Sequence, residues 1–303
     1  MCRFFTALLV LAWGQAALAD APKVVVDIAP VQALVAMVMG DTGAPGLLLP
    51  QGADAHDFQL RPSQARALAA ADLVIWVGPE MTPWLGRALM GGGNGAAVAL
   101  LDAPQVVRRG FEGENAAAGH DHTSHDHLHE GLDPHAWLEP ANAQIWLRVI
   151  ADALAIADPT QAAVYQANAD AAQAQIATIE AEIAAILAPV KGRPFAVTHD
   201  AYGYFADHFG LQIVGSLRTG DAAMPGAAHL TGLQTALLAE GAVCIFPEAN
   251  HDDSSARQMA EAVGLHLGGA LDPEGSSLTP GPALYGDLML GLATVLAACL
   301  SRP

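Results

Sequence analysis

The strongest constraint on the fold of this 303-residue chain is the stretch between Pro159 and Pro189, in which residues 160–188 contain no glycine or proline. Asp158 and Pro159 supply a helix N-cap and a proline suited to the first helical turn. Isoleucines recur on one helical face at Ile176, Ile179 and Ile183. The stretch predicts a helix over residues 159–188, roughly 45 Å long at about 1.5 Å per residue, which is long enough to run along two lobes.

Short apolar runs alternate with helical periods on both sides of this helix. In the first half, the expected strands are 23–28, 46–49, 73–77 and 97–101, and the expected helices are 30–39, 63–70 and 81–90. In the second half, the expected strands are 195–198, 211–216, 242–246 and 266–271, and the expected helices are 202–209, 230–239, 254–263 and 284–300. Such alternation is typical of buried parallel sheets. We therefore expect two α/β lobes, residues 20–140 and 190–303, joined by a helical segment over 141–189.

The N-terminus has the pattern of an export signal. Arg3 precedes the apolar run Phe4–Trp13, and Ala17-Leu18-Ala19 is a small-residue cleavage site. The run is too short to span a bilayer as a membrane anchor. We expect residues 1–19 to be removed after Ala19.

The amino-acid composition limits which kinds of molecule this protein can bind. The chain carries 31 Asp+Glu against 13 Lys+Arg, a formal net charge of -18. Such a surface repels phosphate backbones and favours cations, which argues against nucleic acid as a partner. Once the signal and Cys2 are removed, Cys244 and Cys299 remain, and in an oxidising compartment we expect a disulfide between a strand and the last helix. Two buried free thiols are the alternative.

Four residues far apart in the sequence are candidate ligands for one metal ion. His199 and Asp272 directly follow expected strands of the second lobe, His56 lies in the loop after strand 46–49, and Asp133-Pro134 sets a stiff corner for His135. Ligands of open α/β sheets bind beyond the carboxyl ends of the strands. We expect His56 and His135 from the first lobe to meet His199 and Asp272 from the second in the cleft between them.

Three imidazoles and one carboxylate suit Zn²⁺. Manganese would favour more carboxylate ligands, and calcium or magnesium almost entirely oxygen. The fourth position has rivals: Glu248, the group His251, Asp252 and Asp253, or a water molecule. For Glu248 we favour a carboxylate that organises the turn or orients a ligand.

Residues 110–131 lose all apolar periodicity and are expected to form a surface loop. Its histidines are His120, His122, His125, His127 and His129. Together with nearby acids they can bind zinc loosely, so low-affinity capture or delivery is one interpretation. A solvated loop without a role in binding is the other.

Five motifs, in order along the chain, carry a resemblance to a known family. They are Gly52–Ser63, Ala71–Glu80, Asp133–Leu138, His199–Phe205 and Leu271–Pro273. Together they resemble the zinc-binding periplasmic components of bacterial ABC importers. The resemblance implies two lobes bridged by a rigid helix, zinc in the cleft, a periplasmic monomer, and handover to an inner-membrane permease. A periplasmic zinc chaperone is a further candidate partner. It also implies that His56, His135, His199 and Asp272 are the ligands and that Cys244 pairs with Cys299.

Alternatives stay open at this stage. A manganese- or iron-binding protein of the same family is one alternative. The resemblance implies that manganese-binding relatives typically have an acid at the position of His199, so histidine there favours zinc. Ala55 replaces the proline usual before His56. A zinc hydrolase is a different class, but the sequence has no His-Glu-x-x-His, and residues 120–125 miss the His-x-His-x-Asp-His pattern by one serine. A third alternative is a protein that mediates surface adhesion through its acidic face, and only the acidic composition supports it. We expect a binding protein and not an enzyme.

Overall fold

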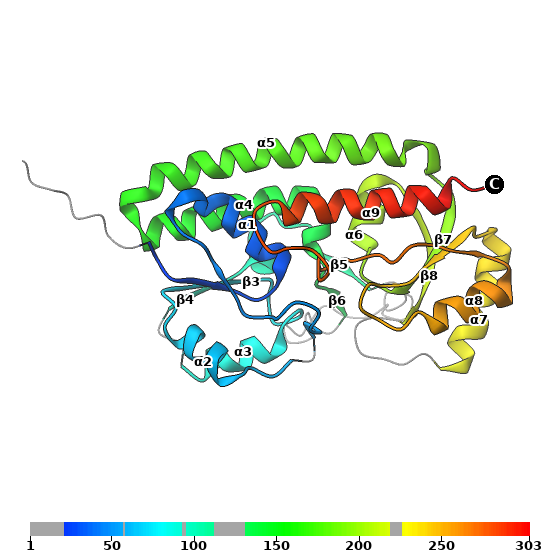
Figure 1. Cartoon of the computed structure of the whole chain (residues 1–303), viewed down its shortest axis with the longest axis horizontal. Helices are drawn as coiled ribbons and strands as arrows, with labels where there is room; N and C mark the ends of the chain where they lie inside the picture. Colours follow the sequence, from blue (N-terminus) through cyan, green and yellow to red (C-terminus); the bar gives the residue numbers. More distant parts are fainter. Residues whose placement is uncertain (1–20, 57, 93–94, 112–130, 219–225) are drawn as a thin grey trace, which may run out of the picture.

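Two four-stranded parallel sheets lie side by side beneath one long helix, α5 (Ala162–Leu187), in the computed structural model of this chain (Figure 1). The structure describes residues 21–56, 58–92, 95–111, 131–218 and 226–303. The predicted fold class, two parallel α/β lobes joined by a long helix, is confirmed. The expected signal and the five loop histidines lie outside the described residues.

The first lobe is built on a sheet of order β2-β1-β3-β4. Its strands are β1 (Val24–Val26), β2 (Gly46–Leu47), β3 (Leu73–Trp76) and β4 (Ala96–Ala99), and its helices are α1 (Ala29–Met39), α2 (Pro62–Ala69) and α3 (Pro83–Met90). All residues of β1 and β3 are buried, as apolar runs in a parallel sheet require. Asp27, at the carboxyl end of β1, accepts hydrogen bonds from the Val77 backbone and the Thr82 hydroxyl. Burial raises the pKa of Asp27 to about 6.

The second lobe repeats this plan with the order β10-β9-β7-β8. Its strands are β7 (Pro194–His199), β8 (Gln212–Arg218), β9 (Cys244–Phe246) and β10 (His266–Leu267), and its helices are α6 (Gly203–Phe209), α7 (Ala227–Glu240), α8 (Ser254–Val263) and α9 (Leu284–Leu300). Strand β10 ends at Leu267, earlier than expected. A Cβ on Gly268 would lie 2.3 Å from the ring of Phe246, so the ring packs against bare backbone where the strand stops. Leu271 returns to the sheet in a single bridge with Glu248.

A disulfide joins Cys244 in β9 to Cys299 in α9, as predicted. Both cysteines are almost wholly buried. The bond ties the last helix to the sheet of the second lobe.

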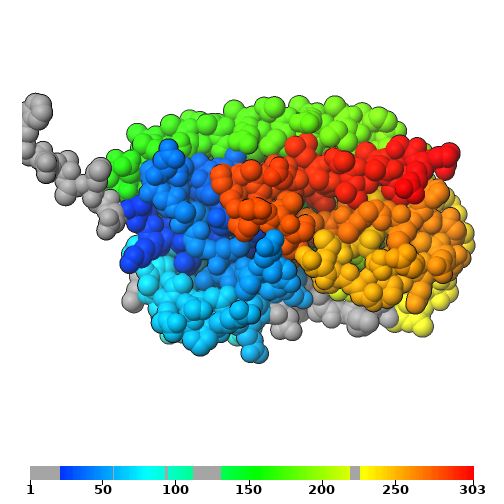
Figure 2. Space-filling view, in the orientation of Figure 1, coloured from blue at the N-terminus to red at the C-terminus, as the bar shows by residue number. Residues whose placement is uncertain are grey.

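The linking segment contains two antiparallel helices. Helix α4 (Pro140–Ala157) packs against α5, which also contacts α1 and α9. Asp158 accepts a hydrogen bond from the Thr160 backbone, and a 3₁₀ turn over Pro159–Gln161 precedes α5. The long helix therefore starts at Ala162, three residues later than expected. It covers both lobes, with α9 running beneath it (Figures 1 and 2).

A short hairpin that was not predicted lies between the lobes. Strand β5 (Arg109–Gly110) pairs antiparallel with β6 (Leu132–Asp133), and residues 111–131 connect them in the sequence. In the part of the chain that the structure describes, no helix is both long and apolar enough to cross a membrane.

His208, in α6, connects the second lobe to Glu139, at the end of the first lobe, and to Glu180 in α5. Its Nδ1 lies 2.6 Å from the Glu139 carboxylate and its Nε2 lies 3.0 Å from that of Glu180. Donating to both acids requires a proton on each ring nitrogen. The hydrogen bond to Glu139, with help from Glu180, raises the pKa of His208 despite its partial burial.

This ion pair should make stability depend on pH. Because the folded state holds the His208 proton to higher pH than the unfolded chain does, the stabilisation is complete below about pH 6.5 and is lost as pH rises through the raised pKa. We expect His208→Gln to lower the free energy of unfolding at about pH 6 and to lower it less at about pH 9. Urea denaturation of both proteins at the two pH values measures this, and an equal difference at both would contradict it.

Candidate metal centre

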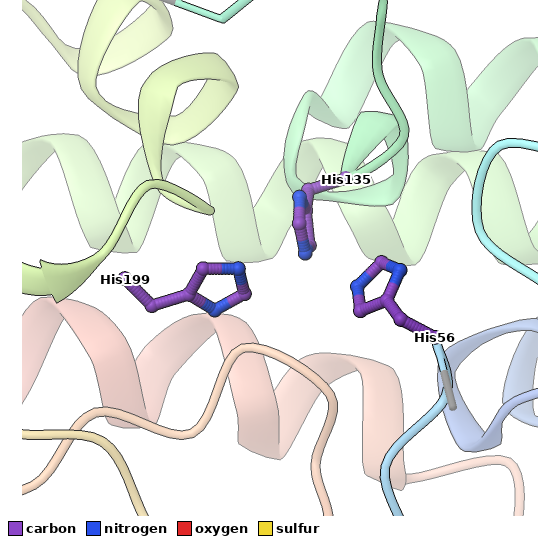
Figure 3. A group of neighbouring side chains, drawn as sticks. All are labelled: His56, His135 and His199. Carbon is purple, nitrogen blue, oxygen red and sulfur yellow. The ribbon is translucent and has the colours of Figure 1, made fainter. Parts of the chain in front are cut away.

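Three imidazoles from distant parts of the chain converge between the lobes (Figure 3). One ring nitrogen from each of His56, His135 and His199 lies within 4.8 Å of the others. The ring centroids of His135 and His199 are 5.0 Å apart. The ring centroid of His56 lies 5.7 Å from that of His135 and 6.3 Å from that of His199. The structure therefore brings together the three histidines that the sequence analysis singled out.

His135 is held by the corner that Asp133-Pro134 creates. The Asp133 carboxylate accepts a hydrogen bond from the His135 backbone at 2.9 Å and lies 2.8 Å from the ring Nδ1. Behind it, the buried Trp137 indole donates to the Pro273 carbonyl at 2.8 Å. Asp133 and His135 are both fully buried. The ring is thus fixed in orientation before any ligand arrives.

His199 is the last residue of β7, where the strand opens into the pocket. Its Nδ1 lies 2.9 Å from Glu248, which follows the neighbouring strand β9. Burial is the largest single influence on Glu248 and would raise its pKa, but the hydrogen bond from His199 together with the charges of His199, His251 and His135 lowers the net pKa. Glu248 therefore lies behind His199 as a charged acceptor, the arrangement that orients a metal-binding imidazole.

His56 comes from the loop after β2. Its backbone N–H donates to the Asp54 carboxylate at 2.9 Å. The carbonyl of the preceding residue, Ala55, accepts a 2.7 Å hydrogen bond from the Trp84 indole, and Ala55 is fully buried. Burial and this hydrogen bond anchor the loop at Ala55.

The arrangement suits a divalent transition-metal cation that prefers nitrogen ligands. The Nδ1 atoms of His135 and His199 each face a carboxylate, so the Nε2 atom of each ring is the one available to bind a metal ion. Within the described residues, Nε2 of His135 is buried and makes no hydrogen bond. A buried nitrogen lone pair without a donor costs free energy unless a metal or proton meets it. Three neutral imidazoles match the ligands of Zn²⁺.

Asp272 is not part of this cluster. One carboxylate oxygen accepts hydrogen bonds from the Ser276 backbone at 2.8 Å and its hydroxyl at 2.9 Å, and the other accepts from the Ser277 backbone at 2.8 Å. It lines the pocket beside the histidines. Its role as fourth ligand stays a prediction.

The rivals for the fourth position are also engaged. His251 Nε2 lies 3.4 Å from Oε1 of Glu248, whereas His199 contacts the other carboxylate oxygen, Oε2. Asp252 accepts a hydrogen bond from the Ser254 backbone, and Asp253 pairs with Arg257. These acids organise the start of α8.

A pocket of about 90 Å³ opens beside the cluster. Among its lining residues are Asp54, Arg218, Glu248, Asp272 and Glu274. Burial, followed by the charge of Glu248, raises the pKa of Glu274 to about 8. The sequence analysis did not identify Glu274 as a pocket residue or Asp133 as the partner of the His135 ring. The one sequence signal for the role of Asp133 is its position two residues before His135.

The fold and the pocket together define a class of protein: a two-lobed, helix-linked binding protein that presents three imidazoles between its lobes. The chain matches the family described as zinc-uptake complex component A, periplasmic, over residues 24–299, and it belongs to that family. It is 46% identical to the high-affinity zinc uptake system protein ZnuA of Paracoccus denitrificans, with 99% of each chain covered. It is 34% identical to the protein of the same name from Yersinia pestis, with 91% of each covered.

A solved structure supports the fold. A crystal structure of ZnuA superimposes with a TM-score of 0.77 at 24% identity, covering 93% of this chain and all of the other.

Proposed function

We propose that this protein captures Zn²⁺ in the periplasm and delivers it to the inner-membrane permease of an ABC importer. The observation that carries the proposal is the buried cluster of His56, His135 and His199, with a carboxylate behind two of the rings. Membership of the zinc-uptake family supports both the cargo and the delivery. His56, His135 and His199 are the proposed ligands, and Asp272 or a water molecule completes the tetrahedron.

Zinc is favoured over manganese by the donor atoms. All three clustered donors are imidazole nitrogens, whereas a manganese site would be expected to recruit carboxylate oxygens. The nearest acids, Asp133 and Glu248, instead accept hydrogen bonds from the rings. We infer capture and release without chemical turnover, since the family is one of uptake components.

The remaining assignments follow from this function. Residues 1–19 are the proposed export signal, residues 20–140 and 190–303 the two lobes, and 141–189 the link. The protein acts as a monomer, and a periplasmic zinc chaperone is a possible donor. The histidines of residues 110–131 are proposed as an auxiliary, low-affinity zinc-binding loop.

Titration with zinc tests the proposed function. We expect one tight site in the mature chain, measured by competition with a chromophoric chelator, and much weaker binding of Mn²⁺. Deleting residues 117–130 should leave this tight site intact and lower only the total zinc bound at high concentration, because all three clustered histidines lie outside the deleted segment.

Two results would contradict this account. Absence of a tight site in the intact chain would remove the proposed function. Loss of the tight site on deleting 117–130, with the protein still folded by circular dichroism, would mean that the loop supplies primary ligands.

A further inference from the structure

We propose that Arg109 is a positioning residue for the metal site: its guanidinium ties the hairpin β5–β6 to helix α6 and so holds His135 in place against His199. This inference rests on the proposed function, because its consequence is measured as zinc binding. Arg109 acts through Asp133 and through Asp207 in α6.

The first step of the argument is the link from Arg109 to Asp133. The two residues are directly opposite each other in the hairpin, and a guanidinium nitrogen lies 4.0 Å from Asp133 Oδ2. Asp133 Oδ1 is the atom that holds His135, whereas Oδ2 is buried and makes no hydrogen bond within the described ranges. A fully buried carboxylate needs a nearby positive charge. Arg109, with its side chain 15% exposed, supplies it.

The second step is the link from Arg109 to the other lobe. Its Nε donates to the Asp207 carboxylate in α6 at 2.9 Å. Its backbone N–H donates to the Tyr204 hydroxyl at 2.8 Å, and that hydroxyl donates to the Asp133 carbonyl at 3.0 Å. Both strands of the hairpin are therefore bound to the same face of α6.

Gly203 provides independent support for this placement. A Cβ added to Gly203 would lie 2.2 Å from a guanidinium nitrogen of Arg109 and 2.3 Å from its central carbon. The guanidinium thus packs against bare backbone at the first residue of α6, four positions after His199. Any larger residue at position 203 would displace it.

These contacts place one side chain between the segments that carry two of the three histidines. The hairpin leads into His135, and the start of α6 follows His199. Without the guanidinium, Asp133 would lose a nearby positive charge and the hairpin would lose its ion pair with Asp207 in α6, while the hydrogen bonds to Tyr204 would remain. Because outer partners of metal ligands typically change affinity by 10–100-fold, we expect an effect of roughly tenfold.

Two variants test the proposal by different routes. Arg109→Met keeps an apolar stem of similar shape and removes the charged guanidinium, while Gly203→Ala keeps the arginine and displaces its flexible end. Each should raise the zinc dissociation constant roughly tenfold, and the double variant should be no weaker than Arg109→Met alone, because both act through one guanidinium. Gly232→Ala is the matched control, since a Cβ there meets nothing within 4 Å.

A spectroscopic readout separates positioning from general destabilisation. The visible absorption spectrum of the Co²⁺-loaded protein reports coordination geometry, and we expect it to change in both variants and not in Gly232→Ala. Circular dichroism verifies folding, and if Arg109→Met does not fold, Gly203→Ala carries the test. Dissociation constants within twofold of the parent protein, additive effects in the double variant, or an unchanged Co²⁺ spectrum would overturn the proposal. Failure of the parent protein to bind zinc would instead refute the proposed function.

Discussion

Replacing His135 with alanine should weaken zinc binding by roughly 10²–10³-fold. Structural zinc sites bind with about 10–16 kcal/mol in total, so each of four ligands would contribute roughly 2.5–4 kcal/mol. The loss falls at the high end for His135 because the ring is fully buried and already oriented by Asp133. Competition titration against a chelator of known affinity measures the change.

The matched control for this variant is His266→Ala. His266 is an exposed histidine in β10 and belongs to no group of clustered ligands among the described residues. It should leave the zinc affinity unchanged. A His135→Ala protein that is folded and binds zinc within about tenfold of the parent would show that this ring is not a ligand.

Removing the disulfide should produce the largest loss of stability. The Cys244–Cys299 bond closes a loop with a sequence separation of 55, for which the chain-entropy relation gives about 4 kcal/mol. We expect the double variant Cys244→Ala/Cys299→Ala to lose this amount of unfolding free energy. Denaturation with guanidinium chloride, in the presence of a metal chelator, measures it without the added stabilisation from bound zinc.

Reductant provides the control for this experiment. It should lower the stability of the parent protein toward that of the double variant and should leave the variant itself unchanged. A loss below about 1 kcal/mol would mean that the closed loop is already constrained in the unfolded chain.

The sequence predicted the fold closely because buried parallel strands are apolar throughout and helices have a clear period. Val24–Val26 and Leu73–Trp76 illustrate the first pattern, and the isoleucines of α5 the second. The predicted end of a strand was wrong where a glycine interrupts the apolar run. The run from His266 to Leu271 was expected to be one strand, but Gly268 lies under the Phe246 ring and the strand ends at Leu267.

The three histidines could be identified because each stands at a strand end or a stiff corner, and strand ends of parallel sheets face the same side. The structure adds which ring nitrogen is available, through Asp133 and Glu248. Asp272 was chosen on the same positional rule, but the nearby serines that bind its carboxylate lie in a turn whose geometry no periodicity reveals. Arg109 and Gly203 are brought together only by tertiary structure, so no local pattern marks them.

The most direct test of the account is the position of zinc in crystals of the zinc-loaded protein, located by anomalous diffraction at the zinc absorption edge. We expect one strong peak between the lobes, about 2.0–2.1 Å from a ring nitrogen of each of His56, His135 and His199. A peak elsewhere in the molecule, with these three rings uncoordinated, would contradict it.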